Sequence, residues 1–250
     1  MTLSKAKIKY IRSLEQKKVR NADHVFVAEG PKVVGDLLQT FEPLLTAATT
    51  EWLESHPSTG GERFEVSAEE LRKASLLLHP QEVIAVMRMP GDCVPPIERG
   101  KLVLALDDIQ DPGNLGTIIR IADWFGITDI YCSAHTADAW SPKVVQAAMG
   151  SHARVAVHYA DLLQLLAERP EGLPVWGTLL DGRNIYNEPL GTEGIIVMGN
   201  EGNGLSPAIR QTVTHPLFIP NYPAGQPTAD SLNVAVATAI TCAEFRRREL

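Results

Sequence analysis

Residues 102–120 read LVLALDDIQDPGNLGTIIR. The first five residues form a continuous apolar run, which is typical of a strand buried on both faces of a parallel sheet. The Asp-Pro-Gly that follows indicates a turn, and the apolar spacing after it predicts a helix over 115–125 with Asn114 at its N-cap. A buried strand that leads through a short loop into a helix is the repeating unit of an α/β fold.

The same alternation continues to the C-terminus. Further apolar runs predict strands at 130–132, 155–157, 175–180, 195–198 and 217–219. Periodic segments predict helices at 142–149, 162–169, 207–213 and 232–248, with Ser141 and Ser206 as the caps of the first and the third. Strands that alternate with helices predict a parallel sheet with crossover helices over residues 101–250.

A second, smaller α/β region precedes this one. Short apolar runs predict strands at 25–28, 44–48, 64–66 and 82–89, with helices at 31–39 and 68–78. The stretch PGDCVPP at 90–96 is rich in proline and is typical of an interdomain linker. We therefore predict a domain over 1–90, a linker over 91–100 and a domain over 101–250.

Charge is distributed unevenly along the chain. The whole protein has a formal net charge of −7, but residues 1–35 hold eight basic and only three acidic side chains. A basic segment on an acidic body is expected where one part of a protein meets a polyanion, although a solvated surface helix is an equal alternative. The candidate polyanion-binding residues are Lys5, Lys7, Lys9, Arg12, Lys17, Lys18 and Arg20.

The composition also limits the class of protein. The three cysteines and seven histidines show no metal-ligand spacing, so we expect neither a metal site nor a disulfide framework. The apolar runs are too short to span a membrane, and the lysine-containing start does not resemble a secretory signal, so we expect a cytoplasmic protein.

Three loops could carry chemistry, and each follows a predicted strand or opens a helix. They are NLGTIIR at 114–120, MGNEGNG at 198–204 and SLNVAVA at 231–237. Because the carboxyl ends of parallel strands meet at one edge of a sheet, these loops can converge there. Taken singly, each loop is also compatible with a capped helix or a tight turn. The second lacks both the GxGxxG order and the Lys-Ser/Thr of a phosphate-binding loop, and this disfavours a nucleotide-dependent oxidoreductase.

Taken together, the three loops resemble motifs 1, 2 and 3 of the SpoU (TrmH) branch of the SPOUT methyltransferases, over about residues 101–245. Residues 11–20 and 26–30 more loosely resemble the L30e-like RNA-binding domain that many members carry. The resemblance implies a trefoil knot in the C-terminal domain, a homodimer, S-adenosylmethionine as the cofactor and methyl transfer to a ribose 2′-hydroxyl of RNA. It favours rRNA over tRNA.

The resemblance also assigns roles to residues. The positions implied to line the cofactor pocket are Leu180, Gly199, Ile219 and Leu232. Those implied to be catalytic are Asn114, Arg120, Glu201, Ser231 and Asn233. Since a guanidinium hardly ever loses its proton, we expect Arg120 to bind a substrate phosphate and to stabilise the developing alkoxide.

One segment departs from the family pattern. The loop over 221–230 is longer than in many relatives, and we expect Tyr222, Pro223 and Pro227 to reshape the pocket rim or the substrate entrance, with Asp230 adding a negative charge. The alternative function that we weighed is a catalytically silent RNA-binding factor in ribosome assembly.

Overall fold

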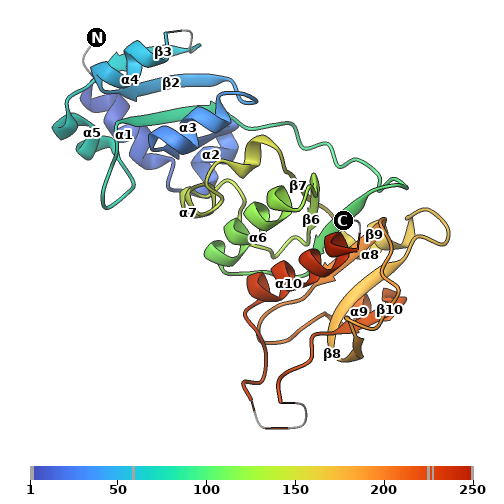
Figure 1. The fold of residues 1–250 in the computed structure, drawn as a ribbon. Helices are drawn as coiled ribbons and strands as arrows, with labels where there is room; N and C mark the ends of the chain where they lie inside the picture. Colours follow the sequence, from blue (N-terminus) through green and yellow to red (C-terminus); the bar gives the residue numbers. More distant parts are fainter. Residues whose placement is uncertain (1–2, 58–59, 224–225, 227, 249–250) are drawn as a thin grey trace. The chain divides into compact units, whose positions relative to one another are not determined.

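Contacts between residues divide the computed structural model into two units, coloured along the chain in Figure 1. Unit 1 consists of residues 1–91 and 138–153, and unit 2 of residues 92–137 and 154–250. The structure describes residues 3–57, 60–223, 226 and 228–248.

Unit 1 is built on a four-stranded sheet with the order β1-β4-β2-β3. Strand β4 pairs antiparallel with both β1 and β2, whereas β2 and β3 are parallel. The strands are β1 (Val25–Glu29), β2 (Pro43–Ala48), β3 (Glu62–Glu65) and β4 (Val83–Arg88). The helices are α1 (Lys5–Ser13), α2 (Lys17–Asp23), α3 (Pro31–Leu37), α4 (Thr50–Ser55), α5 (Ala68–Ala74) and α7 (Pro142–Ala147).

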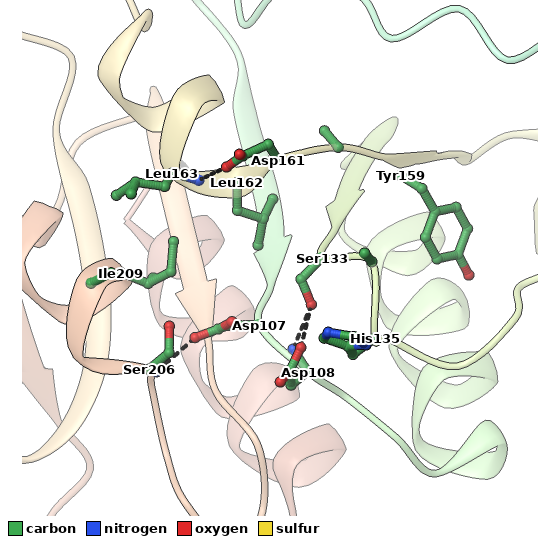
Figure 2. Close-up of a pocket in the computed structure, with 13 residues that line it drawn as sticks. Asp107, Asp108, Ser133, His135, Tyr159, Asp161, Leu162, Leu163, Ser206 and Ile209 are labelled. Carbon is green, nitrogen blue, oxygen red and sulfur yellow. Dashed lines mark hydrogen bonds between the residues drawn. The ribbon is translucent and has the colours of Figure 1, made fainter.

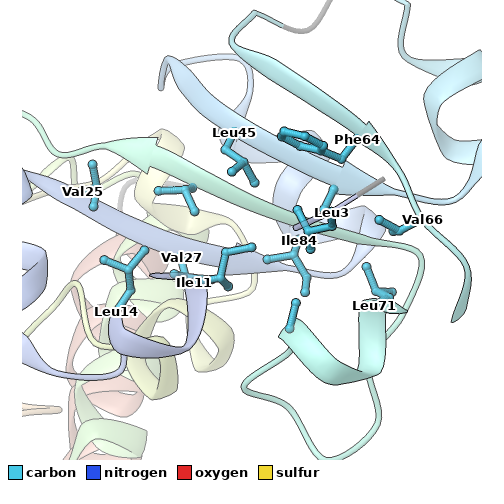
Figure 3. Close-up of a cluster of buried hydrophobic side chains, with 13 residues drawn as sticks. Leu3, Ile11, Leu14, Val25, Val27, Leu45, Phe64, Val66, Leu71 and Ile84 are labelled. Carbon is cyan, nitrogen blue, oxygen red and sulfur yellow. The ribbon is translucent and has the colours of Figure 1, made fainter. Parts of the chain in front are cut away.

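Both faces of this sheet are buried. Side chains alternate along β1, so Val25 and Val27 lie in one hydrophobic cluster while Phe26 and Ala28 lie in the other. Figure 3 shows the first cluster, in which Val25 and Val27 pack with Ile11 of α1 and other apolar side chains. A sheet covered on both faces explains why its strands are apolar along their whole length.

The segment 138–153 belongs to unit 1, although the sequence predicts it as part of the 101–250 domain. Val145 of α7 is 1% exposed and lies in the second hydrophobic cluster. The ring of Trp140 lies 4.7 Å from that of Phe26, and His152, in a short 3₁₀ turn (Ser151–Ala153), packs against Trp140. These nonlocal apolar contacts bind the segment to unit 1, and the predicted second domain therefore differs from unit 2 at this point.

Unit 2 contains a six-stranded sheet in which every pairing is parallel, with the order β10-β8-β9-β5-β6-β7. This confirms the predicted α/β fold with a parallel sheet. The strands are β5 (Leu102–Leu106), β6 (Asp129–Cys132), β7 (Ala156–Tyr159), β8 (Val175–Asn184), β9 (Gly194–Met198) and β10 (His215–Phe218). Every residue of β5 and β9 is buried, as expected for the central strands.

Helices lie against this sheet in two pairs: α6 packs against α10, and α8 packs against α9 (Figure 1). Their bounds are α6 (Pro112–Trp124), α8 (Leu162–Ala167), α9 (Pro207–Thr212) and α10 (Val234–Arg247). No helix in the described part of the chain is long and apolar enough to cross a membrane.

The start of α6 differs from the prediction. Asp111, not Asn114, is the N-cap, and its Oδ1 accepts a hydrogen bond from the Asn114 backbone N–H at 2.8 Å. Pro112 then occupies the first helical position, where its fixed φ suits the helix and its missing N–H costs nothing. Because Asp111 caps the helix, the side chain of Asn114 is free to bind elsewhere.

Candidate active site

A cavity of about 800 Å³ lies along β8 and at the carboxyl ends of β9 and β10. We call it the β8–β10 pocket. Three segments line it: residues 178–181 of β8, residues 198–205 at the end of β9 and in the loop after it, and residues 217–219 with 230–232 and 234 before and within the start of α10. The pocket therefore lies at the sheet edge where ligands of parallel α/β folds bind.

Side chains from all three predicted loops are joined by hydrogen bonds. Asn114 Nδ2 donates to Glu201 Oε1 at 2.5 Å, and Asn233 Nδ2 donates to Asn114 Oδ1 at 2.9 Å. The three residues are separated by 87 and 119 positions in the sequence. The expected convergence of the three loops is therefore present in the fold.

The orientation of both amides follows from the fixed ends of this network. Asn233 caps α10, and its Oδ1 accepts from the backbone N–H groups of Ala235 and Val236, at 3.0 and 3.3 Å. Its Nδ2 must then face Asn114. At the other end, the Glu201 carboxylate can only accept, so the Nδ2 of Asn114 faces it. The helix N-terminus thus orients both amides and, through them, Glu201.

The loop after β9 is a tight turn that brings backbone close to the pocket. Asn200 and Gly204 exchange backbone hydrogen bonds of 3.0 and 2.9 Å, and the Asn200 Oδ1 accepts from the N–H groups of Gly202 and Asn203. A Cβ at Gly199 would lie 2.4 Å from the Gly204 carbonyl carbon. Only glycine fits there, and the turn depends on it.

All four residues predicted to line a cofactor pocket, which are Leu180, Gly199, Ile219 and Leu232, line the β8–β10 pocket. Leu180 is 73% exposed and Leu232 is 48% exposed, so both offer apolar surface to a ligand in the pocket. Glu201 and Ser231 of the predicted catalytic set also line it.

Two of the predicted catalytic residues stand outside the hydrogen-bond network. Ser231 is exposed and lines the pocket, but it makes no hydrogen bond to Glu201 or Asn233 in the described structure. Arg120 is exposed on α6 and has no hydrogen-bond or ion-pair partner among the described residues. Asp123, three residues further along α6, binds the guanidinium of Arg154 and not that of Arg120.

The long loop before α10 is described only in part. Tyr222 is 96% exposed, and Asp230 lines the β8–β10 pocket. Pro227 lies outside the described residues. The predicted effect of this loop on the substrate entrance stays a prediction.

The sequence reasoning missed an ion pair in the pocket wall. Arg210 Nη2 lies 2.5 Å from Asp181 Oδ2, and both residues line the pocket beside Thr178. A signal was available for Asp181, because it follows the apolar run 175–180 as Asp107 follows 102–106. Nothing in the sequence pairs it with an arginine 29 positions away.

The predicted RNA-binding residues fall into two groups in unit 1. Lys7 pairs with Glu62 at 2.7 Å, and Arg12 donates to the carbonyl oxygen of Ser75. Arg20 is 2% exposed and pairs with Asp138, so its assignment to RNA binding is corrected: it holds unit 1 together. Four exposed lysines remain, and we call them the lysine set: Lys5, Lys9, Lys17 and Lys18.

No group of three or more metal-ligating side chains in the described ranges could hold a metal ion. The polar groups of the β8–β10 pocket include amides, backbone N–H groups, the hydroxyls of Thr178 and Ser231 and the carboxylates of Asp181, Glu201 and Asp230; the one guanidinium in this lining, that of Arg210, is paired with Asp181, so the carboxylates outnumber it. Such a pocket favours a ligand that carries positive charge and an apolar body.

Comparison with protein families gives two matches. The chain matches the SpoU rRNA methylase family over residues 101–243 and the MRM3-like substrate binding domain over residues 5–85. The first match covers more than half of the chain and all three predicted loops, and it confirms the resemblance inferred from them.

Individual relatives are similar over nearly their whole length. The chain is 34% identical to the 23S rRNA (guanosine(2553)-2′-O)-methyltransferase of Bacillus subtilis, covering 96% of each protein. Its structure matches that of a TrmH-family protein from Porphyromonas gingivalis with a TM-score of 0.91 and 41% identity, covering 99% and 100% of the two chains. It also matches an AdoMet-bound rRNA methyltransferase from Sinorhizobium meliloti, with a TM-score of 0.85, 30% identity and coverage of 100% and 97%.

Proposed function

The chain belongs to the SpoU rRNA methylase family, and on that premise we propose that it transfers a methyl group from S-adenosylmethionine to a ribose 2′-hydroxyl of ribosomal RNA. The observation that carries the proposal is the network Glu201–Asn114–Asn233 at the β8–β10 pocket. It supports an intact catalytic site, and the alternative of a silent RNA-binding factor has no such support.

The β8–β10 pocket fits S-adenosylmethionine in size and in chemistry. Its volume of about 800 Å³ lies within the range of pockets that hold compact ligands. Leu180, Ile219 and Leu232 offer apolar surface for an adenosine, and the carboxylates of the pocket suit a cationic amino acid moiety. When bound, the cofactor supplies a methyl group on a positively charged sulfur. The predicted trefoil knot belongs to this proposal, since in the family it forms this pocket.

The side chains of the site would position the ribose and stabilise charge. Asn114 is held by Glu201 and Asn233 and would orient the ribose. The exposed guanidinium of Arg120 would bind a substrate phosphate and stabilise the alkoxide that develops at the 2′-oxygen. The phosphate or a water molecule would take the proton, because the guanidinium stays protonated.

RNA binding would rest on the lysine set of unit 1. These ammonium groups are exposed, so they can replace counterions along a phosphate backbone without first breaking an internal ion pair. Because the protein as a whole has a net charge of −7, RNA binding would depend more strongly on these lysines. A ribosomal RNA substrate would also place the protein in the cytoplasm.

We include in the proposal that the protein acts as a homodimer. Two large apolar side chains remain exposed on the packed pair α6 and α10: Trp124 is 85% exposed and Val236 is 49% exposed. A second copy of the chain that covered these side chains would remove their apolar surface from water. Sedimentation or light scattering at micromolar concentration should give twice the mass of one chain.

Mapping of 2′-O-methyl groups in total RNA tests the function most widely. RNA from cells with and without the protein would be compared at every ribose. We expect one or a few rRNA positions to lose the modification when the protein is absent. Loss at a tRNA position alone would overturn the rRNA assignment, and an unchanged map would reject the proposed activity.

A further inference from the structure

A second cavity, of about 570 Å³, lies at the carboxyl ends of β5, β6 and β7, beside the start of α9 (Figure 2). We call it the β5–β7 pocket. It is separated from the β8–β10 pocket by the turn that follows β9: residues 199–205 line the latter, and Ser206 lines the former. Asn200, which lines the β8–β10 pocket, donates through Nδ2 to the carbonyl oxygen of Asp108, which lines the β5–β7 pocket, at 2.8 Å.

Three carboxylates lie in its wall, and each has one oxygen engaged. Asp107 Oδ2 accepts from the Ser206 backbone N–H at 2.7 Å. Asp108 Oδ1 accepts from Ser133 Oγ at 2.7 Å, and Asp161 Oδ1 accepts from the Leu163 N–H at 3.0 Å (Figure 2). The second oxygen of each carboxylate has no hydrogen-bond partner among the described residues. The pocket therefore offers acceptors that are held in place.

Apolar and flat surfaces complete the wall. Leu163 and Ile209 lie on the side of the pocket opposite His135 in Figure 2. Leu163 is 44% exposed although it is a large apolar residue. His135 is exposed, and its ring makes no hydrogen bond within the described structure. A flat group could thus lie between aliphatic side chains and an imidazole, with its edge toward the carboxylates.

The charge of the pocket decides which occupant fits. A phosphate would be repelled by three carboxylates. The carboxylates do not form a metal-binding group with other described side chains. The remaining fit is a flat group whose edge carries N–H donors, and a nucleobase has that form.

We propose that the β5–β7 pocket binds a nucleobase of the substrate RNA, with the base edge donating to Asp108 and to Asp107 or Asp161. The inference rests on the proposed function for the presence of RNA, and it adds a site that reads the sequence around the methylated ribose. Guanine carries an imino and an amino donor on one edge and should bind best. Adenine and cytosine carry one amino group, and uracil, with a single imino donor, should bind least.

Binding of free nucleosides tests the pocket without relying on catalysis. The full chain, labelled at its Leu and Ile methyl groups, would first be saturated with S-adenosylhomocysteine and then titrated with guanosine, cytidine or uridine while methyl NMR spectra are recorded. We expect the methyl signals of Leu162, Leu163 and Ile209 to shift, most with guanosine and least with uridine. The signals of Leu180 and Ile219 report on the other pocket and should stay in place. No shift at the first three residues, or a shift with spermidine but not with nucleosides, would overturn the proposal.

The variant Asp108→Asn tests the same site with RNA. Asn can still accept from Ser133 and tolerates the left-handed backbone of this position (φ 58°), but it presents an amide N–H₂ group where a carboxylate oxygen faced the pocket. We expect the KM for RNA to rise about tenfold or more, with the affinity for S-adenosylmethionine unchanged. The exposed Asp92→Asn is the matched control.

These experiments distinguish a failure of the proposed methyl transfer from a failure of the proposed base-binding site. If nucleosides shift the pocket signals but the wild-type protein methylates no RNA, the proposed function fails and the base-binding site stands. If the wild-type protein methylates RNA while Asp108→Asn has the wild-type KM, the base-binding site is wrong and the proposed function stands.

Discussion

Exchanging the amide and the carboxylate of the Asn114–Glu201 contact should lower activity in each single variant and restore it in the double variant. In Asn114→Asp a carboxylate replaces the amide that donates to Glu201 at 2.5 Å, so two like charges face each other. In Glu201→Gln the acceptor is weakened. In the double variant, the new amide at position 201 can donate to the new carboxylate at position 114, whose other oxygen still accepts from Asn233.

The size of the effect follows from the contact that is lost. A hydrogen bond to a charged group contributes about 1.5–3 kcal/mol. At 1.36 kcal/mol for each factor of ten, this corresponds to about a 10- to 100-fold loss of kcat/KM in each single variant. Asn114 and Glu201 are half-buried, so solvent screens the contact in part and the lower half of that range is expected. If the two losses were independent, the kcat/KM of the double variant would be lowered by their product. We expect its kcat/KM to be about tenfold higher than that value.

The assay is transfer of a labelled methyl group to rRNA, with kcat/KM measured for the wild-type protein, both single variants and the double variant. Asn187→Asp places the same new charge on an exposed position of unit 2 and serves as the control. Circular dichroism and thermal unfolding would show that all variants fold. If the two single effects simply multiply in the double variant, the pair is not coupled and the network does not act as described.

Three further outcomes are expected. Arg120→Ala should lower kcat by about 10²–10³-fold with calorimetric affinity for S-adenosylmethionine unchanged, because the guanidinium acts on the RNA, and wild-type turnover would reject its role. Changing all four lysines of the lysine set to Gln should weaken RNA binding and reduce the slope of log affinity against log salt by about 3, since each phosphate contact contributes about 0.7. Lys7→Gln should change this slope less, because Lys7 is paired with Glu62. If the wild-type protein and the variant of the lysine set had equal slopes, the RNA surface would lie elsewhere. Burial lowers the pKa of His152 from 6.5 to about 4, so between these values the unfolded chain binds a proton that the folded chain does not. The contribution of His152 to the free energy of unfolding should therefore fall by about 3 kcal/mol from pH 6.5 to pH 4, and urea denaturation of His152→Phe should show a shallower fall than the wild-type protein; parallel curves would contradict this assignment.

The sequence predicts the architecture well because local patterns determine it. The run Leu102–Leu106 is apolar throughout, and a central parallel strand has to be. The three loops could be placed at one sheet edge because each adjoins a strand or a helix start, and parallel strands end on the same side. The hydrogen bonds between Asn114, Glu201 and Asn233 are consistent with that placement.

The structure differs from the sequence predictions where contacts between residues far apart in the chain determine the packing. The periodicity of α7 predicts a helix but not the sheet that it covers, and that choice depends on Val145 and Trp140 meeting Phe26. Counting charges treats all basic residues alike, whereas Arg20 is buried against Asp138, which is 118 positions away. At the start of α6, Asp111 and Asn114 are both good caps, and Pro112 favours the earlier one.

The central claim is that the three loops form one site where a sulfonium methyl group meets a ribose oxygen. Purified protein would be incubated with unmodified rRNA and S-adenosylmethionine that carries a trideuterated methyl group, and the RNA would be digested to nucleosides for mass spectrometry. The account predicts deuterium in a 2′-O-methyl nucleoside. Deuterium in a methylated base, or none in RNA although calorimetry shows that the cofactor binds, would contradict it.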